Sequence, residues 1–104
     1  MKQYHPKKRI DIIVESVLLR SPTDTLDRTD VRGYSVLPIL EGRGMLNAWS
    51  SEGQVSNAAN MVALLCIVDS SQADRVIDAV FAAIRDRIGF VTVSDVFVIR
   101  PERF

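Results

Sequence analysis

The chain has 104 residues, of which 47% are hydrophobic and 25% charged, and its formal net charge at pH 7 is zero. This length and composition predict one globular domain with a modest core. The balanced charge gives no support to a nucleic-acid or acidic-membrane partner, and a single cysteine excludes an internal disulfide and a multi-thiolate metal site. Because no signal-peptide pattern and no membrane-length apolar run is present, we expect a soluble, cytoplasmic protein.

Residues 1–7 are polar and contain Pro6, so we expect a frayed lead-in. His5, the only histidine, lies there without a carboxylate cluster, and we interpret it as a solvated side chain. From Lys8 to Glu15 apolar residues alternate with polar ones, which predicts the first strand.

A helix-start pattern follows this strand. Ser21 is a candidate N-cap, Pro22 suits the first helical position, and Asp24 stands three residues after the serine. This pattern predicts a helix to about Thr29. A second strand is expected to open at Gly33, and Pro38, which lacks an amide hydrogen, indicates that this strand lies at an edge.

The segment from Glu41 to Ala58 is predicted to be a long mobile loop, rich in glycine and serine and holding the only tryptophan, Trp49. A loop of this length in a small domain is typically functional or disordered. Gly42 and Gly44 flank Arg43, so the backbone can approach a ligand closely with a guanidinium beside it.

The second half of the chain repeats the strand–helix–strand order. The nearly all-apolar run from Asn60 to Val68 predicts a strand buried on both faces, with Cys66 as a core residue. Ser71 is the predicted cap of a second helix, whose apolar residues recur at three and four positions. The last strand is expected from Phe90 to Ile99.

This order of elements predicts an α+β, ferredoxin-like βαββαβ fold, in which a four-stranded antiparallel sheet carries both helices on one face. The other face has no covering element in the chain. Since a soluble monomer rarely exposes a large apolar patch, we predict an oligomer packed through its sheets.

Motifs for catalysis are absent from the sequence. The glycines do not continue into a dinucleotide fingerprint or a P-loop, and the single histidine rules out a Ser-His-Asp set in the folded core. We therefore predict that the protein is not an enzyme. All three lysines lie in the first eight residues and all ten arginines follow, so later positive charges are of the forked kind that suits phosphate and carboxylate.

The order of elements, with its long loop between the second and third strands, resembles the PII signal-transduction proteins. Closest is the PII-like branch linked to bicarbonate uptake and carboxysomes, which has runs similar to Glu15-Ser16-Val17-Leu18-Leu19, Gly33-Tyr34-Ser35-Val36 and Glu41-Gly42-Arg43-Gly44. The resemblance extends from Lys8 to Arg103. It implies a homotrimer that binds adenine nucleotides between subunits, with a T-loop that changes shape and docks on a protein partner.

The resemblance also implies which residues bind ligand. Gly33, Tyr34 and Ser35 match the adenosine-binding segment, and Gly42, Arg43 and Gly44 match the base of the T-loop near the phosphates. Arg87, Ile88 and Gly89 match the start of the phosphate-binding B-loop. Arg100 matches a basic residue at the end of the last strand that reaches phosphate, and Arg103, close behind it, is expected to join it. Bicarbonate is expected at Gly42, Arg43 and Gly44. Each arginine alone is equally well explained as a surface charge.

Departures from the family pattern refine these expectations. Phe90 follows Gly89 directly, where the family continues with aspartate, glycine and lysine, so we expect ADP or AMP to be favoured over ATP. Met45-Leu46 replaces the T-loop glutamine of the 2-oxoglutarate response, which favours a small anion such as bicarbonate. The resemblance thus predicts a non-catalytic sensor that controls a partner, for example a bicarbonate transporter, in inorganic carbon uptake.

Two alternatives of other classes remain open at this point. One is a ferredoxin-like regulatory module that binds a small molecule without nucleotide, and the other is a weak nucleotide hydrolase. Only a nucleotide site predicts a large affinity loss when Arg100 is changed to alanine, and a phosphate-release assay would reveal hydrolysis. Binding of RNA through the sheet is disfavoured, because the few aromatic residues form no paired stacking motif.

Overall fold

The computed structural model describes residues 2–43, 48–50, 60–85, 87 and 89–99. Its strands are β1 (His5–Glu15), β2 (Tyr34–Pro38), β3 (Glu41–Arg43), β4 (Ala48–Ser50), β5 (Met61–Val68) and β6 (Gly89–Val98). Its helices are the short 3-10 turn η1 (Ser16–Leu18), α1 (Arg20–Arg28) and α2 (Ser70–Ile84). In the described ranges, neither α-helix has the length and apolar character needed to cross a bilayer.

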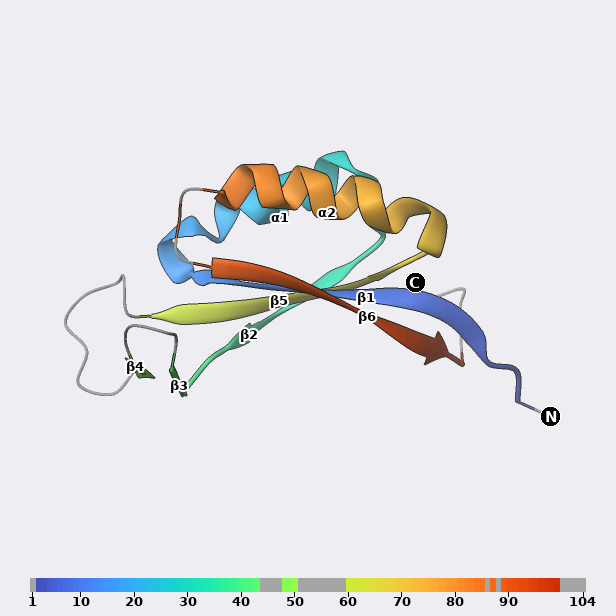
Figure 1. The fold of residues 1–104 in the computed structure, drawn as a ribbon, viewed down its shortest axis with the longest axis horizontal. Helices are drawn as coiled ribbons and strands as arrows, with labels where there is room; N and C mark the ends of the chain where they lie inside the picture. Colours follow the sequence, from blue (N-terminus) through green and yellow to red (C-terminus); the bar gives the residue numbers. More distant parts are fainter. Residues whose placement is uncertain (1, 44–47, 51–59, 86, 88, 100–104) are drawn as a thin grey trace.

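The larger sheet has the strand order β2-β5-β1-β6, and all its neighbouring strands are antiparallel. Both α-helices lie on one face of this sheet (Figure 1). The predicted ferredoxin-like α+β fold is therefore confirmed. β2 pairs only with β5, so Pro38 does lie on an edge strand, as its missing amide hydrogen indicated.

The core lies between the helices and the central strands. Ile10, Ile12 and Val14 of β1 are fully buried because alternate residues of a strand point to the same face. They pack in one cluster with residues of β5, α1 and α2, namely Leu26, Leu64, Cys66, Val68, Ala73, Val76, Val80 and Ile84. Cys66 is thus a core residue, as predicted.

The first strand begins earlier than its apolar alternation indicated. His5, Pro6 and Lys7 belong to β1 and pair with Val98, Phe97 and Val96 of β6, so the prediction of a frayed lead-in is wrong for residues 5–7. β5 pairs with β1 only from Lys8 onward. This end of β1 therefore pairs with β6 alone, as half of a two-stranded ribbon beyond the four-stranded part of the sheet.

Both helices begin before their predicted caps. α2 begins at Ser70, and its N-cap is Asp69, whereas the predicted cap was Ser71. The Asp69 carboxylate makes no cap hydrogen bond. That carboxylate accepts a hydrogen bond from the Lys7 ammonium, which, together with the Lys7 charge, lowers the pKa of Asp69. α1 begins at Arg20 after Leu19, and the Ser21 hydroxyl within it donates to the Ala83 carbonyl oxygen at 3.5 Å.

α1 ends in a Schellman arrangement. The Val31 amide donates to the Leu26 carbonyl at 3.4 Å, and the intervening Asp30 takes a left-handed conformation with φ 60°. Arg75 of α2 donates to the Thr29 carbonyl at 3.4 Å, so an uncapped carbonyl at this helix end gains a charged partner. Asp30 therefore holds a conformation that glycine adopts without steric cost.

We predict that Asp30→Gly stabilises the fold by roughly 0.5–1 kcal/mol, because it removes the left-handed strain of a residue with a Cβ. Urea denaturation followed by circular dichroism measures this difference. The control is Asp27→Gly in the last turn of α1, which is expected to destabilise by a few tenths of a kcal/mol, roughly the difference in helix propensity. A loss of stability in Asp30→Gly would contradict the strain assignment.

A second prediction concerns Cys66, whose thiol is buried. Burial, with a smaller effect of the nearby Asp11 charge, raises the pKa of Cys66 to about 11. We expect no labelling by a thiol-specific disulfide reagent at pH 8 in the native protein, and complete labelling in guanidinium chloride. Rapid labelling of the folded chain would show that this part of the core opens readily.

Candidate functional site

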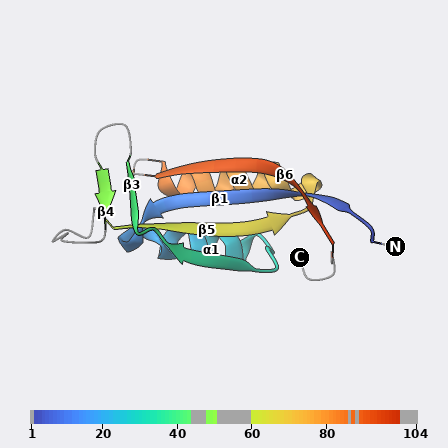
Figure 2. The ribbon, with the colours of Figure 1, turned by 90° about the horizontal axis from the view of Figure 1, so that it is seen from below.

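The β3–β4 hairpin stands at one end of the larger sheet. Gly42 pairs with Trp49, and Figure 2 shows β3 and β4 lying across the ends of the main strands. Part of the segment predicted as a loop, Glu41 to Ala58, therefore forms regular β structure. Gly44 and residues 51–58 lie outside the described residues, so the predicted mobility stays a prediction.

The turn between α2 and β6 lies at the same end of the sheet. The Arg87 amide donates to the Ile84 carbonyl at 2.9 Å, and the Arg87 side chain is exposed. Gly89 opens β6 opposite Val14, which in turn lies opposite Val62, the partner of Pro38. The register thus places Arg87, Gly89 and the entry to the hairpin together at one end.

Gly89 has a steric reason to be glycine. A Cβ at this position would lie 2.6 Å from the Ile13 carbonyl oxygen and 3.0 Å from Cγ1 of Val14. The backbone of β6 therefore approaches β1 more closely here than any other residue would allow. The same bare backbone is suited to a close approach by phosphate oxygens, so the glycine alone does not distinguish the two roles.

Gly33, Tyr34 and Ser35 lie at the beginning of β2, on the edge opposite to β6. Tyr34 pairs with Cys66, four residues along β5 from the Pro38 partner Val62. At strand spacing this places Tyr34 about 13 Å along the sheet and three strands, about 14 Å, across it from Gly89. The single chain does not bring the adenosine-binding and phosphate-binding candidates together.

The remaining candidates cannot be located at side-chain level. Gly44, Ile88, Arg100 and Arg103 lie outside the described residues, and Arg43 is placed only through its β3 pairing with Ala48. The described ion pairs are Lys7–Asp69, Lys8–Asp95 and Arg9–Asp11. Arg87 takes part in none of these pairs between described residues.

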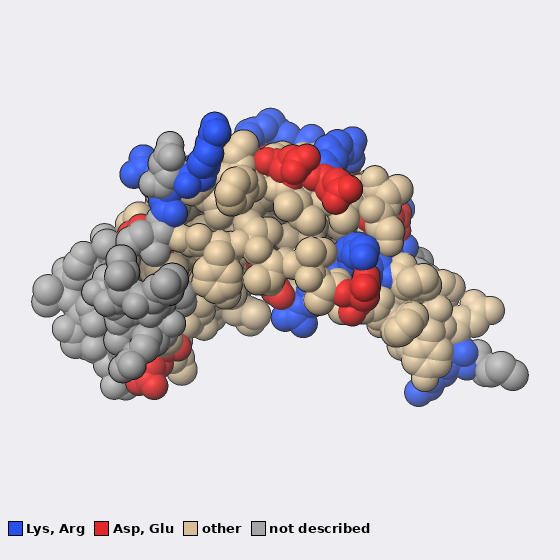
Figure 3. Space-filling view, in the orientation of Figure 1, with Lys and Arg blue, Asp and Glu red and all other residues tan. Residues whose placement is uncertain are grey.

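Charge and metal chemistry narrow the possible ligands. Acidic and basic side chains are interspersed on the face drawn in Figure 3, and a broad uncharged area lies between them. This face therefore offers no continuous basic surface for a nucleic-acid backbone. Among the described residues, no group of three His, Cys, Asp or Glu side chains is placed to hold a metal ion.

The open face of the sheet is apolar at the hairpin end. Cross-strand partners share a face, so Leu37, Ala63, Ile13 and Phe90 form one row across all four strands. Leu37 is 48% and Phe90 44% exposed, and Ala63, Leu65 and Ile67 of β5 are only half-buried. The prediction that β5 is buried on both faces is therefore wrong for the isolated chain.

Comparisons with known proteins agree with this architecture. The family model described as nitrogen regulatory protein P-II matches residues 7–103. No match was found among curated proteins.

Among solved structures, one of CPII, a nitrogen regulatory PII-like protein from Thiomonas intermedia bound to ADP, AMP and bicarbonate, is 24% identical. The match covers 100% of this chain and 98% of the CPII chain, with a TM-score of 0.87. CPII bound to ADP and bicarbonate is 26% identical over 100% of this chain and 99% of its own, with a TM-score of 0.83. The apo form of CPII is 23% identical, and the match covers 94% of this chain and 97% of the CPII chain with a TM-score of 0.73. With its family model matched over nearly the whole length, the chain belongs to the nitrogen regulatory protein P-II family.

Proposed function

We propose that this protein is a non-catalytic PII-like regulator that senses ADP or AMP together with bicarbonate. Ligand binding shifts the Glu41–Ala58 segment, its T-loop, between conformations and so controls a protein partner in inorganic carbon uptake, such as a bicarbonate transporter. CPII, which is 26% identical in sequence to this chain, has been solved with ADP and bicarbonate bound. This likeness is the main support for the choice of ligands.

A site between subunits is supported by the distance between its two groups of proposed phosphate-binding residues. Arg87 and Gly89 stand at the start of β6, whereas Arg100 follows its last residue, Val98, by two positions. A strand from Gly89 to Val98 spans about 30 Å, far more than a nucleotide diphosphate. One nucleotide can meet both groups only where two copies of the chain adjoin.

The proposed site therefore divides between neighbouring copies of a homotrimer. One copy contributes Gly42, Arg43, Gly44, Arg87, Ile88 and Gly89, and the adjoining copy contributes Gly33, Tyr34, Ser35, Arg100 and Arg103. Among the described residues, Gly42, Arg43, Arg87 and Gly89 of the first set lie at the hairpin end of the sheet, whereas Gly33, Tyr34 and Ser35 of the second set lie at the far end of β2. This separation suits a head-to-tail interface that closes into a ring. The apolar row of Leu37, Ala63, Ile13 and Phe90 gives such a ring a surface to bury.

The hairpin position suits a switch. Gly42 lies in β3, at the same end of the sheet as the Arg87–Gly89 turn, so an anion bound at this end would lie near the base of the T-loop. We place bicarbonate there, against Gly42, Arg43 and Gly44. A difference in binding of about 1–3 kcal/mol between the two loop conformations would be sufficient for signalling.

The first test changes Arg87 to alanine. Loss of a charged hydrogen bond to phosphate is expected to weaken ADP binding by roughly 10- to 100-fold in calorimetry. The matched control is Arg85→Ala, because Arg85 is also exposed, lies two residues away and has no assigned ligand contact. Equal affinities for both variants, or no ADP or AMP binding by the unchanged protein, would refute the proposed site.

A second test uses two glycines with different surroundings. A Cβ at Gly33 meets no atom within 4 Å, so Gly33→Ala should fold normally and weaken AMP binding only if adenosine lies against this backbone. Gly89→Ala should destabilise the fold by about 1–3 kcal/mol through its clash with β1. Thermal denaturation separates these effects from calorimetric affinity, and unchanged AMP affinity in Gly33→Ala would remove Gly33 from the site.

A further inference from the structure

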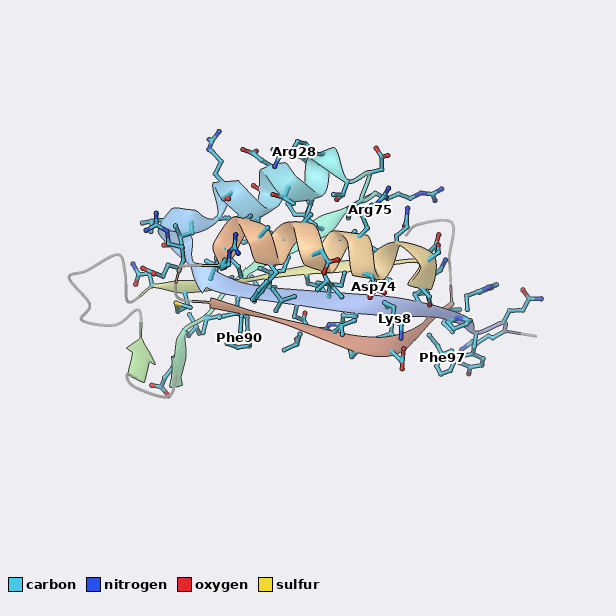
Figure 4. The ribbon with its side chains drawn as sticks, turned by 45° about the horizontal axis from the view of Figure 1, so that its top comes forward. Lys8, Arg28, Asp74, Arg75, Phe90 and Phe97 are labelled. Carbon is cyan, nitrogen blue, oxygen red and sulfur yellow. The ribbon has the colours of Figure 1, made fainter. Side chains whose placement is uncertain are left out.

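An ion pair lies on the uncovered face of the larger sheet. The Arg9 Nε atom donates to both carboxylate oxygens of Asp11, at 3.1 and 3.2 Å. Figure 4 shows Phe90 on the side of the sheet away from the helices, and its cross-strand partner Ile13 shares that side. Arg9 and Asp11 alternate in step with Ile13 along β1, so the pair lies on the same uncovered face.

The surroundings of this pair on the described strands are uncharged. The cross-strand rows that contain Arg9, Asp11 and Ile13 hold no other charged residue. Their other members are Ser35, Leu37, Ala63, Leu65, Ile67, Phe90, Thr92 and Ser94. Lys7, the preceding basic residue in step with Arg9 along β1, pairs instead with Asp69 at the start of α2. Arg9 and Asp11 are thus two opposite charges on a face that is otherwise apolar or neutral.

The pair uses only part of its hydrogen-bonding capacity within the chain. Between described residues, the Arg9 guanidinium donates through Nε alone, although it carries further N–H donors on its two Nη atoms. The side chains of Arg9 and Asp11 are 44% and 25% exposed, so water reaches both while the face is open. Covering the apolar rows removes that water, and a buried charge without enough partners is costly. A surface that covers this face must therefore offer an acceptor to Arg9 and a donor to Asp11.

We propose that a second copy of this chain supplies both groups, with the Arg9 Nη atoms of one copy donating to the neighbouring copy's Asp11. This inference rests on the ring assembly proposed above and adds the contact that fixes its register. Each copy carries one donor beside one acceptor, so every member of a closed head-to-tail ring gives one interchain pair and receives one. The pairing selects one arrangement of the apolar rows against each other, because placing like charges together is unfavourable.

The test exchanges charges between chains. Arg9→Asp gives a chain with two acids at the pair, and Asp11→Arg gives a chain with two bases. The two variants are unfolded in urea, mixed and refolded together, and native mass spectrometry counts pure and mixed oligomers. We expect the ratio of mixed to pure oligomers to exceed that of random association by about tenfold or more, because only mixed oligomers place opposite charges across the contact. Mixing cannot restore an ion pair made within one chain, so this excess would assign the pairing to contacts between copies.

The matched control uses Lys8→Asp and Asp95→Lys. Lys8 pairs with Asp95, and it lies opposite Val68 of the core cluster, which places it on the helix side of the same strand. These variants change the net charge by the same amounts as the first two. Random association is expected for them, and it would show that overall charge does not cause the excess.

The possible outcomes separate this inference from the proposed function. Random association of the Arg9 and Asp11 variants, or an equal excess in the control, would overturn the pairing while leaving the nucleotide site intact. Should a charge-reversed chain fail to refold, Arg9→Gln and Asp11→Asn are mixed instead, since only their mixed oligomers regain an Arg9–Asp11 pair between copies. A monomeric mass of the unchanged protein in light scattering would refute both the pairing and the ring. If the unchanged protein assembles but binds neither ADP nor AMP, the proposed function fails and the mixing result still decides the pairing.

Discussion

The burial of one sheet face under two helices is the constraint on which the rest of the molecule depends. Ile10, Ile12 and Val14 of the central strand β1 are fully buried against this helical layer. Their alternation requires the intervening residues Asp11 and Ile13 to point to the uncovered face. The same pattern that builds the core thus leaves a second surface half-buried, and no element among the described residues covers it.

The regular part of the fold follows from local patterns. The alternation in β1, the apolar run of β5 and the three-four spacing of α2 each specify one period, so those elements were predicted correctly. Helix starts were less predictable because serine and aspartate caps compete with tertiary contacts. Asp69 lies at the N-cap of α2, but its carboxylate pairs with Lys7, and Ser21 donates to the Ala83 carbonyl.

Elements stabilised by distant partners gave no local signal. Residues His5 to Lys7 lack an apolar alternation, yet they are strand because β6 runs alongside them. The short β3–β4 pairing within the glycine-rich segment is similar, since Gly42 and Trp49 meet across a hairpin that no apolar pattern marks. For the site, motif resemblance proposes Arg87 and Gly89 as candidates, but their position at the hairpin end of the sheet depends on strand register, which no local pattern specifies.

The length of β6 links the architecture to the proposed regulation. Its first residue, Gly89, lies beside the hairpin end, and its last residue, Val98, belongs to the ribbon at the opposite end. A ligand held between the start of one copy's β6 and the ribbon of the next would therefore be sensitive to assembly and would contact the hairpin base in the same event. Because Gly42 reaches this end through Pro38 and the sheet edge, a shift in the hairpin need not disturb the buried core of β1 and α2. Stability and switching are then carried by different parts of a small domain, which allows the loop to change without unfolding the rest.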